Sequence, residues 1–288
     1  MNTKKMQALY GLKWNPFAQD IPTEAIFKTP RFHQFCYRVE TLALDGGFAL
    51  ITGESGFGKS ATLRALYDHL SKVPEITVGD IIRPQSGLAD FYREMGAIFG
   101  VELRVSNRWG GYNGLRERWR NHISTTLIRP VLLIDEAQET PHSVLSELRL
   151  LSMDKFDSSN LLTVVLAGDM RLTNSFKSEH LVPLGTRIKT RITLEPWAKP
   201  QLVELLKEGI KKAGNANLLS PGLIETLAEH SAGSPRVLMN LAGECLSTGM
   251  YKESTILDEA VFFEAFPSQS LGTGRRKSST SGTGHKHA

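Results

Sequence analysis

Five short apolar runs are spaced along the chain and predict β-strands. They are Phe48–Thr52, Ile76–Ile82, Val131–Ile134, Leu161–Ala167 and Ile192–Leu194. Longer segments with helical periodicity follow or separate these runs, at about residues 61–72, 87–99, 115–127, 141–153 and 170–180. Strands that alternate with helices predict an α/β fold, in which a five-stranded parallel sheet is covered by helices on both faces.

The pattern changes on either side of this region. Before it, the turn-rich segment 10–17 leads into a predicted helix over Arg31–Leu44, which places Phe32, Phe35, Val39 and Leu42 on one face. After Pro196, four helical segments follow without a strand, at about 199–214, 221–231, 235–249 and 255–265. Prolines at helix starts and glycines at helix ends support these boundaries.

We therefore expect four regions. Residues 1–45 form a lead-in that packs on the nucleotide site, and residues 46–195 form an α/β core. Residues 196–266 form a helical lid domain, and residues 267–288 form a disordered basic tail. The tail contains Arg275, Arg276, Lys277 and Lys286 and no acidic residue, so it accounts for the whole formal charge of +4. Residues 1–266 are neutral overall, and any affinity for DNA there must come from local patches.

Composition argues against a membrane or secreted protein. No apolar stretch approaches the roughly 18–20 residues of a membrane helix, and residues 1–10 lack the apolar core of a signal peptide. Cys36 and Cys245 have no CxxC partners and are expected to be free buried thiols in a reducing compartment. We expect a cytoplasmic protein that does not contact a membrane.

A phosphate-binding loop follows the first predicted strand. The run Gly53-Glu54-Ser55-Gly56-Phe57-Gly58-Lys59-Ser60 fits the pattern GxxxxGK[ST] in full, and Ala61 continues into a predicted helix. Glycines let such a loop curl so that backbone N–H groups and the helix N-terminus face an anion. Lys59 is expected to reach the β- and γ-phosphates of ATP, and the Ser60 hydroxyl to bind Mg²⁺.

Two acids end the third predicted strand. Val131–Ile134 is followed by Asp135 and Glu136, which would emerge at the sheet edge where open α/β sheets bind ligands. Asp135 is expected to hold Mg²⁺ through water, and Glu136 to orient and polarise the attacking water. The pair predicts an ATPase that hydrolyses ATP to ADP and phosphate, rather than a protein that only binds the nucleotide.

With these motifs placed, the chain resembles the AAA+ ATPases, and more narrowly the ExeA/GspA-like group. This group includes secretion-associated ATPases and the TnsC/TniB/IstB-like transposition regulators of bacterial mobile elements. The resemblance covers about residues 8–266. The residues that carry it are Gly11-Leu12, Asn15-Pro16-Phe17, the phosphate loop, Asp135-Glu136-Ala137-Gln138, Arg187-Ile188, Arg191-Ile192 and Gly233-Ser234-Pro235-Arg236.

The resemblance implies further roles. Arg187 resembles the arginine finger that reaches a neighbouring subunit's γ-phosphate, with Arg191 as the alternative, and Arg236 resembles the arginine with which the lid contacts phosphate in the same subunit. Asn15-Pro16-Phe17 is expected to line the adenine pocket, with core packing as the other interpretation of Phe17.

The polar residue that usually ends the fourth core strand is replaced by Gly168-Asp169. A carboxylate beside the γ-phosphate would be repelled unless a cation intervenes, so Asp169 is not assigned as a sensor. Gln138 is an alternative residue for positioning water.

A segment between the second and third strands interleaves basic and aromatic residues. Trp109, Tyr112 and Trp119 lie among five arginines, which are Arg104, Arg108, Arg116, Arg118 and Arg120. Arginines contact phosphates and aromatic rings stack on bases, so these arginines are candidate DNA contacts. The other interpretation is an amphipathic helix whose arginines are solvated or paired with acids.

Secretion-type members of the group carry a membrane helix and a further domain after the ATPase, and no such sequence follows residue 266. We therefore expect a regulator of DNA transposition. With ATP it would assemble on double-stranded target DNA as a homo-oligomer, either a ring or a helical filament. It would then hand the DNA to a separate transposase, with or without an adaptor protein. A cytosolic ExeA-like ATPase for secretion or envelope assembly is the alternative, and a non-hydrolysing nucleotide-gated scaffold is a third.

Overall fold

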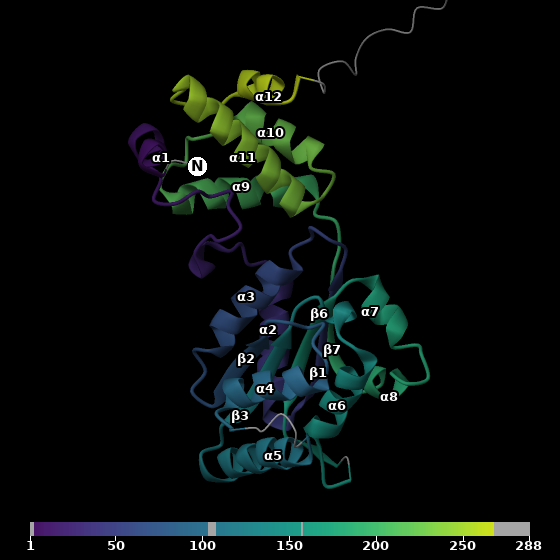
Figure 1. Ribbon diagram of the computed structural model, residues 1–288. Helices are drawn as coiled ribbons and strands as arrows, with labels where there is room; N and C mark the ends of the chain where they lie inside the picture. The colour runs from purple at the N-terminus through teal and green to yellow at the C-terminus, as the bar shows by residue number, and fades with distance from the viewer. Residues whose placement is uncertain (1–2, 103–107, 157, 268–288) are drawn as a thin grey trace, which may run out of the picture.

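The computed structural model describes residues 3–102, 108–156 and 158–267. Figure 1 shows two bodies, an α/β core and a bundle of helices above it. The bundle is joined to the core by the segment that follows the last strand and by the N-terminal segment. The expected tail beyond residue 267 lies outside the described residues.

The core contains a five-stranded sheet in the order β2-β3-β6-β1-β7. Its strands are β1 (Gly47–Gly53), β2 (Ile76–Ile81), β3 (Arg129–Ile134), β6 (Thr163–Gly168) and β7 (Ile188–Leu194). Every neighbouring pair in this sheet is parallel. The predicted fold class is therefore confirmed.

Helices cover both faces of the sheet. One face carries α2 (Pro30–Asp45) and α3 (Lys59–Leu70). The other face carries α4 (Leu88–Phe99), α5 (Arg108–Thr125), α6 (His142–Ser152), α7 (Met170–Ser175) and α8 (Val182–Gly185). Along β1, Ala49 and Ile51 pack against the first group, whereas Phe48 and Leu50 pack against the second. Because every β1 side chain is buried, the strand is a continuous apolar run instead of an alternating pattern.

Helix α5 begins at Arg108, seven residues before the predicted start at 115, despite two glycines in its first turn. Gly111 has a packing role, because a Cβ atom there would lie 3.0 Å from Cδ1 of Tyr92 on α4. The glycine lets the two helices approach closely. Tertiary packing therefore outweighs the low helix propensity of the Trp-Gly-Gly sequence.

The structure also adds elements that periodicity does not reveal. A short antiparallel hairpin, β4 (Met153–Asp154) with β5 (Ser159–Asn160), follows α6. One-turn 3₁₀ helices lie at η1 (Thr23–Ala25) and η2 (Ala137–Glu139). Of the predicted helix at 170–180 only α7 (Met170–Ser175) forms, and the short helix α8 (Val182–Gly185) follows beyond the predicted range. Such elements are too short for a 3.6-residue period to be recognised.

The upper body consists of α9 (Lys199–Ala213), α10 (Pro221–His230), α11 (Pro235–Lys252) and α12 (Glu259–Ala265). Helices α10, α11 and α12 begin with side-chain caps from Ser220, Ser234 and Asp258. Both cysteines are buried and unbridged, Cys245 in this bundle and Cys36 in the core. Within the described residues, no helix combines the length and apolar character needed to cross a bilayer.

The N-terminal segment packs into the helical bundle. Helix α1 (Thr3–Tyr10) contributes Met6 and Tyr10 to the bundle core, and Leu12 is buried beside them. The backbone N–H of Lys13 donates to the carbonyl of Ala213 at 2.8 Å, and Asn215 Nδ2 donates to the carbonyl of Tyr10 at 3.0 Å. This part of the lead-in is thus an additional layer of the bundle.

An ion-pair cluster ties α5 to the hairpin. Arg116 is buried, and its Nη2 lies 3.0 Å from Oδ1 of Asp154, which also accepts from Arg120 Nη2 at 2.6 Å. Arg116 Nη1 donates to the carbonyls of Leu150 and Leu151 at 3.2 and 3.1 Å. The guanidinium of Arg116 therefore stabilises the fold, because its donors are used inside the molecule.

We predict that Asp154→Asn lowers the free energy of unfolding by about 3 kcal/mol, because it leaves the buried Arg116 charge without its counter-ion. Denaturant unfolding at pH 7 measures this. The control is Asp90→Asn in the exposed Asp90–Arg93 pair, which should cost less than about 1 kcal/mol. Equal losses in the two variants would contradict the assignment.

The same pair predicts a pH dependence. Hydrogen bonding from Arg120, with the charges of Arg120 and Arg116, lowers the pKa of Asp154. A carboxyl whose pKa is lower in the folded state stabilises the fold above its unfolded pKa, and this contribution is lost as pH falls through the folded pKa. The wild-type and Asp154→Asn proteins should therefore converge in stability in acid.

Candidate functional site

The phosphate loop connects the end of β1 to α3 at one edge of the sheet. Gly56 and Gly58 have φ angles of 93° and 96°, which other residues rarely adopt. Gly56 also lacks room for a side chain, because a Cβ atom would lie 2.8 Å from Oγ of Ser234. Both glycines are therefore required by the loop's conformation.

Lys59 begins α3 and is 6% exposed. Its ammonium group donates to the carbonyls of Gly53 at 3.0 Å and Glu54 at 3.2 Å. These two hydrogen bonds keep the Lys59 ammonium group against the loop and out of solvent. A triphosphate bound in the loop would meet a buried cation and the N-terminus of α3.

The two acids lie at the same edge of the sheet. Parallel pairing places the carboxyl ends of β1 and β3 on one side, with only β6 between them. At about 4.8 Å per strand, the ends of β1 and β3 are roughly 10 Å apart. The fold therefore brings Asp135 and Glu136 to the same sheet edge as the phosphate loop.

Glu136 adopts a left-handed backbone conformation, with φ 47° and ψ 41°. Asp135 Oδ1 accepts from the Glu136 N–H at 2.9 Å, which stabilises this turn. The Glu136 side chain is exposed, and its carboxylate accepts a hydrogen bond from Nε2 of Gln138. A non-glycine residue in this region is uncommon, and such residues are frequent at functional sites.

Asp169, at the end of β6, has the intervening cation that the sequence did not reveal. Burial opposes its ionisation, but hydrogen bonds from the side chain and backbone of Arg171 outweigh burial and lower the pKa of Asp169. Arg171 Nε lies 2.9 Å from Asp169, and its Nη1 lies 3.0 Å from Glu139. The carboxylate at this strand end is therefore paired with an arginine.

The helical bundle contacts the phosphate loop directly. Arg236 donates from Nη1 to Oγ of Ser55 at 2.9 Å and from its backbone N–H to the carbonyl of Gly56 at 3.2 Å. Ser234, the cap of α11, lies beside the same carbonyl at 3.5 Å. The start of α11 therefore joins the bundle to the phosphate loop.

The segment Asn15-Pro16-Phe17 was expected at the adenine pocket. Phe17 is 7% exposed and belongs to the core of the helical bundle, so this side chain packs in the core, as the second interpretation expected. Asn15 Oδ1 accepts from the Phe17 N–H at 3.0 Å and orders the turn. An adenine contact by Asn15 stays a prediction.

Arg187 lies far from the phosphate loop of its own chain, and Arg191 lies closer to it. In the pairing of β1 with β7, Gly53 is opposite Leu194 and Phe48 is opposite Ile188. At about 3.3 Å per residue, Arg187 is roughly 20 Å along the strand from the loop. Its Nη1 contacts the carbonyl of Pro183, and Arg191 Nη2 lies 3.3 Å from the carbonyl of Gly185. A contact between Arg187 and a nucleotide would therefore have to be in another subunit, whereas Arg191, opposite Leu50, is only about 10 Å along the strand from Gly53.

The candidate DNA arginines fall into different classes. Arg116 is buried and Arg120 shares Asp154 with it, while Arg108 is paired with the buried Glu147. Arg118 is exposed, and no hydrogen bond or ion pair is found for it among the described residues. Arg104 lies outside the described residues.

Aromatic side chains accompany these arginines on α5. The rings of Trp109 and Tyr112 are stacked, with centroids 5.7 Å apart and planes 12° apart. Trp109 is 72% exposed, and Phe156 at the tip of the hairpin is fully exposed. The third aromatic residue, Trp119, is buried in the core. Trp109 and Arg118 are thus solvent-accessible aromatic and basic groups on α5, whereas Tyr112 is half-buried.

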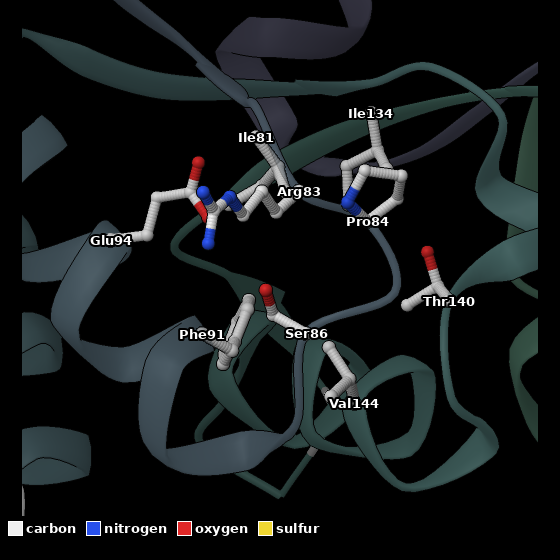
Figure 2. A pocket seen from close by; sticks show the side chains of 9 residues that line it. All are labelled: Ile81, Arg83, Pro84, Ser86, Phe91, Glu94, Ile134, Thr140 and Val144. Atoms are coloured by element: carbon white, nitrogen blue, oxygen red, sulfur yellow. The ribbon is translucent and has the colours of Figure 1, made fainter.

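A small cavity lies beside the strand-end acids. Figure 2 shows its lining, from the ends of β2 and β3, the loop after β2, and α4 and α6. The lining side chains are Ile81, Arg83, Pro84, Ser86, Phe91, Glu94, Ile134, Thr140 and Val144. The hydroxyl of Thr140 is buried there without a hydrogen-bond partner among the described residues. The cavity is too small for a nucleotide, and neither the phosphate loop nor the strand-end acids line it, so it is separate from the phosphate site.

The residues at the loop also fit a magnesium ion accompanying a triphosphate. Ser60 has an exposed hydroxyl and Asp135 a half-buried carboxylate at the same sheet edge. Hard oxygen donors of this kind, completed by phosphate oxygens and water, are what Mg²⁺ prefers. Among the described residues, no group of three or more His, Cys, Asp or Glu side chains forms an all-protein metal site.

Comparison with known proteins agrees with this geometry. Residues 43–176 match the family model described as an AAA domain. The chain is 29% identical over 234 residues to general secretion pathway protein A of Aeromonas hydrophila, an alignment that covers 80% of this chain. The chain spans 42% of the length of that relative.

Solved structures with the same fold include Cdc6p from Pyrobaculum aerophilum, with a TM-score of 0.67, 14% identity, and coverage of 91% of this chain and 72% of that one. The Aeropyrum pernix ORC1 protein in complex with DNA has a TM-score of 0.66 and 17% identity, with coverage of 88% of this chain and 68% of that one. The RuvB branch migration motor of Thermotoga maritima has a TM-score of 0.53 and 16% identity, with coverage of 88% of this chain and 73% of that one. The chain therefore has the P-loop AAA+ fold.

We predict that Mg-ATP raises the stability of the wild-type protein by about 2.7 kcal/mol at a concentration about 100-fold above Kd. Lys59→Ala should lose this effect, because it removes the buried cation from the loop. Thermal unfolding with and without Mg-ATP measures it. Lys72→Ala, an exposed lysine paired with Asp68, is the control and should respond like the wild type. A full ATP response in Lys59→Ala would contradict the site.

Proposed function

We propose that the chain is an ATPase that hydrolyses ATP to ADP and phosphate at the sheet edge formed by the phosphate loop and the strand-end acids. The observation that carries this proposal is the placement of buried Lys59 and the Asp135–Glu136 turn at one sheet edge, after two strands that only β6 separates. The AAA domain match supports the same activity at the level of the family.

Each side chain has a role in this proposal. Lys59 and the loop, Gly53 to Ala61, bind the phosphates, and Ser60 and Asp135 hold Mg²⁺, which supplies positive charge to the phosphoryl group. Glu136 is the base that orients and polarises the attacking water. Arg236 exchanges its Ser55 contact for the nucleotide's phosphates, which is a short displacement because both lie at the same loop.

The finer function that we propose is ATP-dependent regulation of DNA transposition. The chain would form a homo-oligomer on double-stranded DNA, and Arg187 or Arg191 would complete the neighbouring site. Two exposed groups on α5 support DNA binding, since Arg118 is available for phosphate and the Trp109 ring offers a stacking face. One similar structure is the Aeropyrum pernix ORC1 protein in complex with DNA. The transposase would be a separate chain.

A second function is favoured by a specific observation. The alignment with general secretion pathway protein A covers most of this chain, so an ATPase that serves secretion is the alternative. The two candidates differ in one physical property. A transposition regulator binds duplex DNA through phosphate contacts that weaken as salt rises, whereas a secretion ATPase is indifferent to DNA.

Binding of duplex DNA to Glu136→Gln with ATP distinguishes these functions. This variant should hold ATP without turnover, and fluorescence anisotropy should show ATP-stimulated, salt-sensitive binding. Arg118→Glu and Trp109→Ala should each weaken binding about tenfold or more, because they remove a phosphate contact and a stacking face. The charge-matched control is Lys211→Glu on α9, remote from α5. DNA indifference of Glu136→Gln would reject the regulator.

A mixing experiment tests the arginine in trans. Arg187→Ala should lower turnover by about 10³-fold in the assembled protein. Addition of Glu136→Gln subunits should restore activity, because they bring an intact Arg187 to neighbouring Arg187→Ala sites. The double variant Arg187→Ala/Glu136→Gln is the control and should restore nothing. If Arg191→Ala behaves in this way and Arg187→Ala does not, Arg191 is the finger.

A further inference from the structure

Gln138 connects two strand ends of the candidate site. It lies in η2, directly after the Asp135–Glu136 turn, and is half-buried. Its Nε2 donates to the carboxylate of Glu136, and its Oε1 accepts from the backbone N–H of Asp169 at 3.2 Å. One side chain therefore joins the proposed base at the end of β3 to the end of β6.

The chemistry of the two partners determines the amide's orientation. A carboxylate only accepts hydrogen bonds and a backbone N–H only donates one, so the nitrogen must face Glu136 and the oxygen must face Asp169. A leucine at this position would satisfy neither partner. A glutamate would keep the contact with Asp169 but would place a second negative charge against Glu136.

The neighbouring residue leaves space for this contact. Gly168 ends β6, and a Cβ atom there would lie 2.7 Å from Oε1 of Gln138. Any larger residue would displace the amide from the Asp169 N–H. The Gly168-Asp169 pair, which replaces the usual polar strand end, thus provides a backbone donor and room for Gln138.

We propose that Gln138 is the positioning residue for Glu136, and that it supplies the polar function missing from the end of β6. It holds the carboxylate at a fixed place relative to β6 and the phosphate loop, so that the exposed Glu136 side chain is not free to rotate. This inference rests on the proposed ATPase function and on Glu136 as the base. It concerns how the base is oriented and not whether ATP binds.

The test compares Gln138→Leu and Gln138→Glu with wild type. Both should lower kcat by about 10- to 100-fold, the usual effect of losing a residue that orients a site group. Nucleotide affinity, measured with a fluorescent ATP analogue, should stay within about twofold, because Gln138 does not contact the phosphate loop.

Two further variants keep the test decisive. Gly168→Ala leaves Gln138 in place but obstructs its contact, and should reproduce the fall in kcat with retained ATP affinity. Gln85→Leu, at an exposed glutamine in the loop after β2, is the control and should match wild type. Circular dichroism and thermal melting verify that each variant is folded.

The outcomes separate the two levels of the argument. Wild-type turnover in Gln138→Leu and Gln138→Glu, together with an inactive Glu136→Gln, would overturn the role of Gln138 and leave the ATPase function intact. Loss of ATP affinity in Gln138→Leu would overturn it as well, since the residue would then act in binding. A wild-type chain that binds ATP but shows no turnover, with or without duplex DNA, would overturn the ATPase function and this inference together.

Discussion

The structure depends on burial of the parallel sheet on both faces. Because α2 and α3 cover one face and α4 to α8 cover the other, the faces are closed to ligands. Parallel pairing then gathers the carboxyl ends of β1, β3 and β6 at one edge. The phosphate loop, the acid pair and Asp169 are brought together there from positions spread over more than 100 residues of the sequence.

The helical bundle contacts this edge and also includes the N-terminal segment of the chain. Arg236 and Ser234 reach the phosphate loop, while the N-terminal segment with Met6, Tyr10 and Phe17 completes the bundle core. A nucleotide that displaces the Ser55–Arg236 contact would therefore act on a body that includes both ends of the described chain. This gives the α/β core a direct mechanical connection to the bundle.

Arginine pairing separates the structural part of α5 from its accessible part. Arg116 and Arg120 converge on Asp154, and Arg108 pairs with the buried Glu147, which also accepts from Tyr92. Burial and this hydrogen bond raise the pKa of the Tyr92 hydroxyl, so that it remains a donor to Glu147. Trp109 and Arg118 stay exposed at the surface of the helix.

The sequence by itself determined the fold class, the order of the core strands along the chain and the phosphate loop with its acids. Those features depend on local patterns, namely apolar runs, helical periodicity and the spacing of GxxxxGK[ST]. It could not separate buried Arg116 from exposed Arg118, because both lie on one helix and differ only in what packs against them. Packing also decided that Phe17 and α1 belong to the bundle, and that Gln138 joins Glu136 to Asp169. Contacts between residues distant in sequence leave no periodic signal, so only the tertiary structure shows them.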